Sequence, residues 1–139
     1  YSNDPKCRTI SDLTESFIKG VITLDDVLNI VQNNRIVYAP DATMQAMLSD
    51  KKGRVLIIEP GLGYRLEKAQ YSLITNYSIL SPEITKPYIV SGDDRFERAD
   101  ELLKHCNDSF SVAEAFQILK ICEAGRNMGD KSFLCIFSK

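Results

Sequence analysis

The sequence lacks an excess of basic side chains. Its 17 Lys and Arg residues stand against 19 Asp and Glu residues, which gives a formal net charge of −2 at pH 7. Proteins that bind nucleic acid neutralise phosphates with clustered basic side chains. The composition therefore argues against a nucleic-acid partner, and we expect none.

The sequence also lacks a long hydrophobic run. The longest runs, at residues 55–58 and 133–137, are far shorter than the roughly 20 residues that cross a bilayer. The first six residues contain no apolar stretch that could serve as a signal peptide. We therefore expect no membrane partner, while a secreted or periplasmic protein whose leader has been removed stays compatible with the sequence.

Metal-ligand spacing is absent as well. The four cysteines, Cys7, Cys106, Cys122 and Cys135, form no CxxC pair, and the single histidine, His105, has no ligand-like spacing to two of them. We expect neither a zinc site nor a cofactor. The three later cysteines lie in apolar contexts, where a free thiol acts as a small buried hydrophobe. Free thiols favour a reducing compartment, so we expect a cytoplasmic location.

The remaining composition is typical of one globular domain. The chain has 139 residues, of which 44% are hydrophobic and 26% charged, far from the composition of disordered proteins. This length suffices for one hydrophobic core but not clearly for two. We predict a single domain over residues 1–139.

Two pairs of helices are expected, and the first pair lies near the N-terminus. Apolar residues recur at helical spacing from Ile10 onward, and Gly20 is a stop signal. Thr23, followed three residues later by Asp26, predicts the cap of a second helix that ends near residues 33–34.

The second helix pair follows in the last third of the chain. Apolar spacing predicts a helix over residues 94–106, and Ser111 with Glu114 forms a capping box that begins another. The buried face of this last helix is expected to comprise Val112, Ala115, Phe116, Ile118, Leu119 and Cys122.

Between the helix pairs the pattern changes to strands. Residues 42–48 and 54–59, joined by a polar turn that contains Gly53, predict a hairpin. The continuous apolar run at 55–58 indicates a strand that is covered on both faces. Further strands are predicted at residues 63–69, 71–75 and 132–137. The block order of helices and strands favours an α+β fold with a mainly antiparallel sheet and layered helices.

Two polar residues just outside buried elements are candidates for chemistry. Asn76 follows an apolar strand and offers an amide donor suited to a developing oxyanion. Arg95 opens a helix, where its guanidinium could hold a carboxylate or stabilise a thiolate. Taken singly, each also has a purely structural interpretation: a turn residue for the asparagine and a solvated side chain for the arginine.

Taken together, the segments resemble the family of choloylglycine hydrolases, penicillin V acylases and related linear-amide hydrolases. The resemblance covers nearly the whole chain from about Thr9 onward and rests on stretches that follow the family's order. They are residues 23–28, similar to the "T-x-D-E-A" helix; 48–59, similar to the "D-x-x-G-x-x-x-x-x-E" hairpin; 74–77, similar to the "T-N" strand end; and 94–99 with 110–116, similar to the "S-R-F-x-R-A" and "S-V-x-E-A-F" helices.

This resemblance implies part of an αββα sandwich and cleavage of an unstrained amide by an N-terminal cysteine. In such enzymes the cysteine's own amino group is the base, the thiol attacks the carbonyl, and water hydrolyses the thioester. The family's strand-end asparagine, which helps to form the oxyanion hole, falls on Asn76. Its late active-site arginine falls on Arg95, with Arg98 as the alternative. The substrate would be a small acylated amine of the bile-salt, penicillin or acyl-homoserine-lactone type.

The family's opening block, a nucleophilic cysteine followed by an arginine and an aspartate, is not recognisable here. Cys7 superficially resembles such a start, but a helix rather than a strand is expected after it, and cleavage after Lys6 would have to expose it. We therefore expect a C-terminal portion that lacks its nucleophile segment and is inactive alone, with that segment or a companion chain as a partner.

Alternatives stay open at this point. A non-catalytic interaction domain of the same fold would also explain the missing nucleophile. A stand-alone thiol enzyme that pairs Cys122 or Cys135 with His105 is disfavoured, because those cysteines lie on apolar faces where a thiolate is destabilised. Open sheet edges and apolar faces would favour strand exchange or dimers, so we expect a homo-oligomer. The sequence does not distinguish hydrolysis from acyl transfer.

Overall fold

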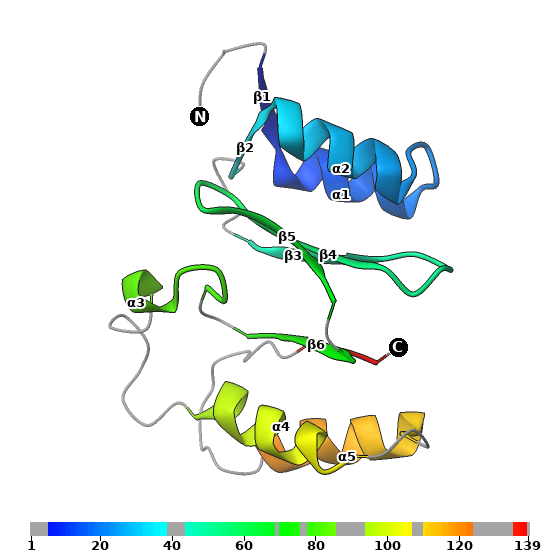
Figure 1. Ribbon diagram of the computed structural model, residues 1–139, viewed down its shortest axis with the longest axis vertical. Coiled ribbons are helices and arrows are strands. Elements are labelled where there is room, and N and C mark those ends of the chain that lie inside the picture. The colour runs from blue at the N-terminus through cyan, green and yellow to red at the C-terminus, as the bar shows by residue number, and fades with distance from the viewer. Residues whose placement is uncertain are drawn as a thin grey trace. The chain divides into compact units, whose positions relative to one another are not determined.

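The computed structural model describes residues 6–38, 44–68, 70–75, 78–85, 94–106, 110–123 and 135–138 (Figure 1). Its contacts divide the chain into two compact units, Tyr1–Lys68 and Ala69–Lys139. Unit 1 contains β1 (Cys7–Thr9), α1 (Ile10–Ile18), α2 (Leu24–Asn33), β2 (Arg35–Val37), β3 (Ala46–Ser49), β4 (Val55–Glu59) and β5 (Gly63–Glu67). Unit 2 contains β6 (Tyr71–Ile74), α3 (Pro82–Thr85), α4 (Arg95–Lys104), α5 (Val112–Glu123) and β7 (Cys135–Ser138).

The first helix pair is confirmed, and side chains cap both helices. Thr9 Oγ1 accepts a hydrogen bond of 3.3 Å from the backbone N–H of Asp12 at the start of α1. At α2, Thr23 Oγ1 accepts from the Asp26 N–H at 3.2 Å, while the Asp26 carboxylate accepts from the Thr23 N–H at 2.8 Å. This reciprocal pair is the predicted capping box, which satisfies two backbone donors that a helix start leaves unpaired.

The predicted hairpin is also confirmed. Strands β3, β4 and β5 form an antiparallel sheet in that order, with Ala46 paired to Ile58 and Ile58 paired to Tyr64. In the β3–β4 turn, Gly53 takes a positive φ of 76°, a conformation that suits a residue without Cβ. The first strand begins at Ala46, four residues later than the sequence predicts.

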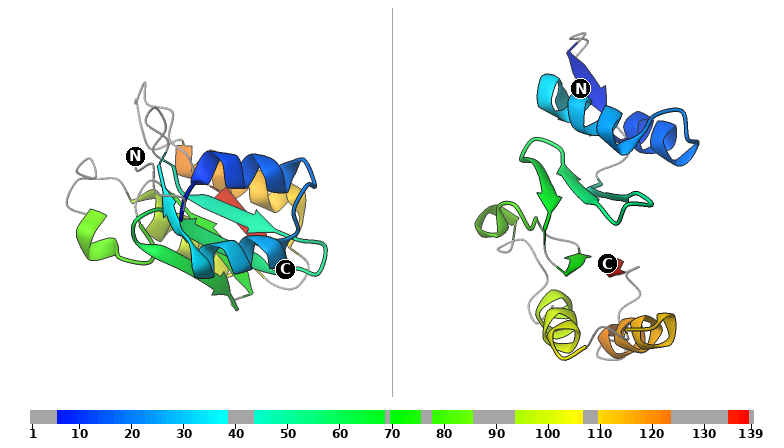
Figure 2. Two further views of the ribbon diagram at one scale, coloured as in Figure 1. Left: turned by 90° about the horizontal axis from the view of Figure 1, so that it is seen from above. Right: turned by 45° about the vertical axis from the view of Figure 1, so that its right-hand side comes forward.

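The core of unit 1 lies between the helix pair and the sheet. Helices α1 and α2 lie side by side along one face of the sheet (Figures 1 and 2). Leu56 and Ile58 of β4 join the same buried cluster as Ile10 and Val27 of the two helices. All five residues of β4 are buried, which confirms the prediction of a strand covered on both faces.

One short strand pair in unit 1 was not predicted. Residues Cys7–Thr9 form β1, which pairs in parallel with β2, so the expectation that Cys7 is not followed by strand structure is wrong. A helix does begin immediately afterwards, at Ile10. Three-residue strands that pair across the intervening helices leave no local periodicity in the sequence, which is why this pair escaped prediction.

Unit 2 also combines a helix pair with a sheet. Strand β6 pairs antiparallel with β7, and Tyr71 is matched to Ser138. Helices α4 and α5 lie side by side (Figures 1 and 2). The buried cluster consists of Leu73, Ala99, Leu103 and Ile118. The predicted capping box of α5 is present, since the Glu114 N–H donates to Ser111 Oγ and the Ser111 N–H donates to the Glu114 carboxylate.

The expected buried face of α5 is only partly correct. Ile118 is 5% exposed, but Val112 is 74% and Phe116 67% exposed. At about 100° per residue, Phe116 lies roughly 160° around the helix from Ile118, so one packed stripe cannot hold both. The side chain of Cys122 lies outside the described residues. The molecule is nevertheless α+β with an antiparallel sheet, as predicted.

Candidate functional site

Of the two predicted site residues, one is described. Asn76 lies outside the described residues. Thr75, immediately before it, is 2% exposed at the end of β6. Arg95 is the first residue of α4 and is only 6% exposed. A buried guanidinium is costly unless it is well compensated, so Arg95 is not the solvated first-turn side chain of the structural alternative.

Arg98 differs from Arg95 in its surroundings. Its Nη2 lies 2.9 Å from the Asp94 carboxylate, and the arginine side chain is 36% exposed. This ion pair spans one helical turn at the start of α4, and such exposed pairs contribute little to stability. Of the two candidate arginines, Arg95 is therefore the buried one and Arg98 the one at the surface.

The N-terminus of α4 and the end of β6 lie at the same end of unit 2. Figure 1 shows α4 running in the opposite direction to β6, so the start of α4 and the end of β6 face the same way within unit 2. The contact between Tyr71, at the start of β6, and Asp100, in the middle of α4, fits this antiparallel arrangement.

A hydrogen bond between Tyr71 and Asp100 connects β6 to α4. Tyr71 Oη donates a 2.6 Å hydrogen bond to Asp100 Oδ1, and Lys104 Nζ lies 2.7 Å from Asp100 Oδ2. Burial, reinforced by the Asp100 contact, raises the pKa of Tyr71 to about 12. Burial of Asp100 works against its ionisation, but the hydrogen bonds from Lys104 and Tyr71 prevail and lower the pKa of its carboxyl group.

The cysteines described offer no activated thiol in unit 2. Cys106 is half-buried against the unit 2 cluster. Burial and the nearby charge of Glu114 raise the pKa of its thiol, which disfavours the nucleophilic thiolate. Cys7 is a free, half-buried cysteine in β1. The side chains of Cys122 and Cys135 lie outside the described residues, and His105 is exposed at the C-terminus of α4.

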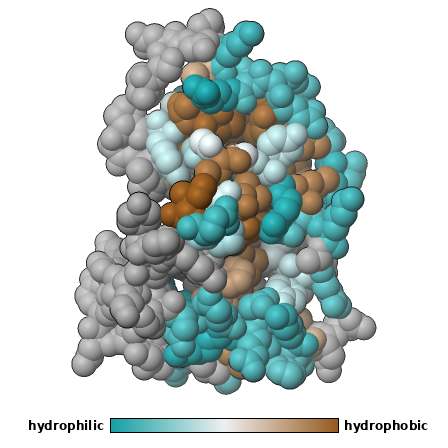
Figure 3. All heavy atoms as spheres, turned by 60° about the vertical axis from the view of Figure 1, so that its left-hand side comes forward, coloured by the Kyte–Doolittle hydropathy of each residue, from teal (hydrophilic) through white to brown (hydrophobic). Residues whose placement is uncertain are grey.

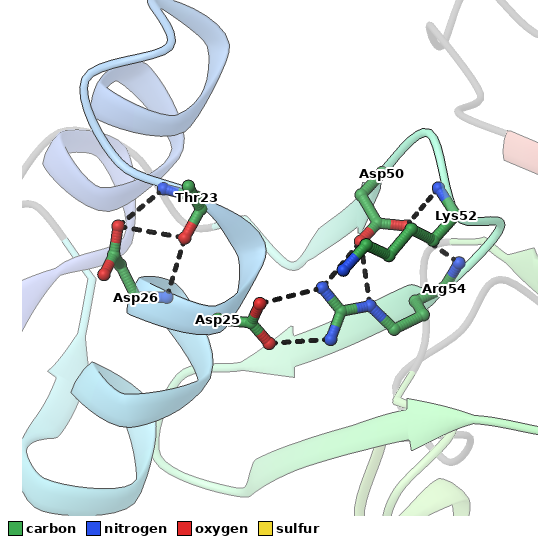
Figure 4. A network of polar contacts seen from close by, with 6 residues as sticks. All are labelled: Thr23, Asp25, Asp26, Asp50, Lys52 and Arg54. Atoms are coloured by element: carbon green, nitrogen blue, oxygen red, sulfur yellow. Dashed lines mark hydrogen bonds and ion pairs between the residues drawn. The ribbon is translucent and has the colours of Figure 1, made fainter.

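In unit 1, the family-like hairpin is tied to α2 by Arg54 (Figure 4). Arg54 Nη1 and Nη2 lie 2.7 and 3.2 Å from the two Asp25 carboxylate oxygens, and its Nε donates to Asp50 Oδ2 at 2.8 Å. Asp50 also accepts from the backbone N–H groups of Lys52 and Arg54, each at 3.0 Å. This network closes the turn and holds it to the helix.

The charges in this network stabilise one another. The hydrogen bond from Arg54 is the main cause that lowers the pKa of Asp25. For Asp50 the effect of burial is outweighed by its hydrogen bonds from Arg54, and its pKa is also lowered. The pKa of Arg54 rises in turn. With both carboxylates engaged by a bidentate guanidinium, the network is structural rather than catalytic.

Unit 1 also contains a pocket that sequence patterns did not indicate. Its volume is about 450 Å³, and it is lined by the end of α2, the first residues of β2, the end of β4, the β4–β5 turn and the start of β5. Volumes of this order suit small-molecule ligands. Its lining comes from two segments far apart in the sequence, residues 31–36 and 58–64, so no local motif predicts it. Gly61 and Gly63, both at positive φ, lie in the second segment.

Apolar side chains reach the surface in several places (Figure 3). The large ones among them are Ile18, Val21, Tyr38, Leu62, Tyr64, Ile84, Val112 and Phe116. No group of three or more potential metal ligands occurs in the described part of the chain. None of the described helices is long and apolar enough to span a membrane.

Comparison with known proteins identified no relative: no protein-family model, no curated protein and no solved structure matches the chain.

Proposed function

We propose that this chain forms part of a linear-amide hydrolase of the N-terminal-nucleophile class that acts on small acylated amines. The observation that carries the proposal is the burial of Arg95 at the first turn of α4. That position is where the family-like arginine falls, and the start of α4 and the end of β6 face the same way within unit 2 (Figure 1). A positive charge and an amide donor at one end of a sheet suit an acyl-transfer site.

The local structure agrees with the family-like motifs in the same order. The stretch 23–28 begins a capped helix, 48–59 is a hairpin, 94–99 begins α4, and 110–116 begins a capped helix. Each unit contains a helix pair and a sheet, and β4 is buried on both faces. These are the parts that an αββα sandwich requires, and we propose this sandwich as the complete fold.

The proposed reaction needs an N-terminal cysteine. Its free amine accepts the thiol proton, the sulfur attacks the amide carbonyl, and the amine product leaves with that proton as the C–N bond breaks. Water then hydrolyses the thioester to the carboxylic acid. The amide of Asn76 would stabilise the oxyanion of each tetrahedral intermediate, and Arg95 would orient the acyl group or the thiolate. The cysteine would come from a segment or companion chain that carries the family's opening block.

The test measures amide hydrolysis by the product of the full reading frame. A panel of glycine-conjugated bile salt, penicillin V and an acyl-homoserine lactone would be assayed for amine release. We expect Arg95→Ala and Asn76→Ala each to lower kcat/KM by about 100-fold or more, with partial retention in Arg95→Lys. Arg98→Ala, as the matched control in an exposed ion pair, should change kcat/KM by less than about threefold.

Two outcomes would overturn the proposal. One is a folded Arg95→Lys protein and a folded Asn76→Ala protein that both keep wild-type kcat/KM. The other is a wild-type product that cleaves none of these amides and bears no N-terminal cysteine. The second candidate, a non-catalytic interaction domain that forms homo-oligomers, is favoured by the exposure of Val112 and Phe116 on α5, and would then take precedence.

A further inference from the structure

The pocket of unit 1 carries an inference that is independent of the proposed amidase. It lies entirely within one unit, so its geometry depends only on contacts described there. Its floor is apolar, because Val31, Ile36 and Ile58 are 7%, 8% and 0% exposed. Leu62 and Tyr64, each 39% exposed, stand where the pocket meets solvent.

The charged side chains that border the pocket are directed away from its floor. In a strand, neighbouring side chains point to opposite faces. Ile58 belongs to the cluster beneath the helices, so Glu59, the next residue in β4, points to the other face. The same alternation sets exposed Arg35 opposite buried Ile36 in β2. The polar character of the pocket must therefore come from other groups.

Those groups are hydrogen-bond acceptors from the end of α2. A helix leaves its last four carbonyls without intrahelical donors. Here the Ile30 carbonyl accepts from the Asn34 backbone N–H at 2.9 Å and from Asn34 Nδ2 at 3.0 Å. The carbonyls of Val31, Gln32 and Asn33, all on residues that line the pocket, keep their acceptor capacity among the described residues.

The two asparagine side chains add to this acceptor surface. Asn33 Nδ2 donates to the Asn29 carbonyl at 2.8 Å, and Asn34 Nδ2 donates to Ile30. With their amide nitrogens so engaged, both side chains present their Oδ1 atoms as acceptors. The carbonyl end of a helix also carries a partial negative charge, and α2 has no basic residue in its last turn to offset it.

We propose that this pocket binds a small organic cation, a primary ammonium group attached to an aromatic or branched apolar body. The ammonium donates its three N–H bonds to the acceptors at the end of α2, and the body packs on Val31, Ile36 and Leu62. Tyr64 contributes its ring face to the cation. An anionic ligand of the same size would meet oxygen acceptors and the negative helix end, which disfavour it, and Arg35 is the positive charge in the lining that would favour it.

The test uses 2-phenylethylammonium chloride as the probe and follows backbone amide chemical shifts of the full chain by ¹H–¹⁵N NMR. A ligand of this size with ordinary efficiency has a Kd on the order of 1 mM. We expect saturable shifts at residues 33–36 and 61–64. The anion phenylacetate, which is close in size, and the equally sized neutral 2-phenylethanol should bind at least about fivefold more weakly, which is the worth of one charge-assisted contact.

Variants distinguish specific recognition of the cation from nonspecific hydrophobic binding. Tyr64→Leu keeps an apolar side chain but removes the ring, and should weaken amine binding about threefold. Arg35→Gln removes the positive charge from the pocket lining and should strengthen amine binding about twofold. Arg8→Gln, an exposed arginine in β1 that does not line the pocket, is the matched control and should leave the Kd unchanged.

The outcomes decide the proposal either way. Shifts confined to the pocket with the order amine, alcohol, carboxylate support it. Preference for the carboxylate together with weaker binding in Arg35→Gln would overturn it, because the ligand class would then be anionic. Absence of saturable shifts up to about 20 mM amine, well above the expected Kd, would overturn it as well, as would shifts spread over the whole chain.

Discussion

Unit 1 and unit 2 each combine a helix pair with a sheet, but different interactions join the two layers. Among the described side chains, the buried cluster of unit 1 contains ten residues from two helices and three strands, and that of unit 2 contains four residues from α4, α5 and β6. In unit 1 the Arg54 network joins the hairpin to α2, and in unit 2 Tyr71 and Asp100 join β6 to α4. The proposed catalytic arginine belongs to unit 2.

The largest expected difference between the units comes from their cores. Leu56→Ala in β4 removes a completely buried side chain and should lower the free energy of unfolding by about 3–5 kcal/mol. Leu73→Ala in β6, which is 5% exposed, should cost about 2–3 kcal/mol, because a side chain that is not completely enclosed leaves a cavity that collapses more readily. Urea unfolding measures both, and equal losses would contradict the comparison.

The Tyr71–Asp100 contact gives unit 2 a pH dependence. Because the folded-state pKa of Tyr71 is raised to about 12 from 10.0, its contribution is complete below pH 10 and is lost as pH rises from 10 to 12. Tyr71→Phe should cost about 1–2 kcal/mol at neutral pH. Its stability should also fall less steeply than wild type above pH 10. Thermal unfolding followed across this range would refute the assignment if the two curves stayed parallel.

The helix caps should be equivalent in the two units. Thr23→Ala in α2 and Ser111→Ala in α5 each remove a side-chain acceptor from a reciprocal capping box, at a cost of about 1 kcal/mol. Circular dichroism during urea unfolding would test this. A cost at Thr23 several times larger than at Ser111 would show that the difference between the units extends to their helix ends.

The smallest effect is expected at the surface of α5. Phe116→Ser should change the free energy of unfolding by less than about 0.5 kcal/mol, since the ring is 67% exposed. Ile118→Ser, two residues away and 5% exposed, is the buried counterpart and should be strongly destabilising. Light scattering of the same proteins tests the proposed self-association: Phe116→Ser should reduce it if α5 takes part, and an unchanged oligomer would remove α5 from the interface.

Local signals explain what could be predicted from the sequence. The caps at Thr23 and Ser111 and the Gly53 turn each depend on residues within a few positions of one another, so they were predictable. The β1–β2 pair and the Arg54–Asp25 contact join residues about 30 positions apart, and no local pattern encodes them. The exposure of Phe116 was missed because α5 carries apolar residues around most of its circumference, so hydrophobicity alone did not select the packed stripe.

The candidate site was predictable only in part for the same reason. The position of Arg95 at a helix start follows from local periodicity, but its burial depends on tertiary packing. Arg98, three residues later, has the same chemistry and a surface ion pair. The sequence left the two as alternatives, and the structure separates them by exposure. The unit 1 pocket is lined by two segments, residues 31–36 and 58–64, that no local motif connects.

The most direct test of the proposed function is intact-mass and N-terminal analysis of the product expressed from the full reading frame, before and after brief incubation with an acyl-amide substrate. The proposal predicts a polypeptide that begins with cysteine, alone or in a companion chain, and a mass increase equal to the acyl group on that polypeptide. A product with no N-terminal cysteine and no acylated species would contradict it.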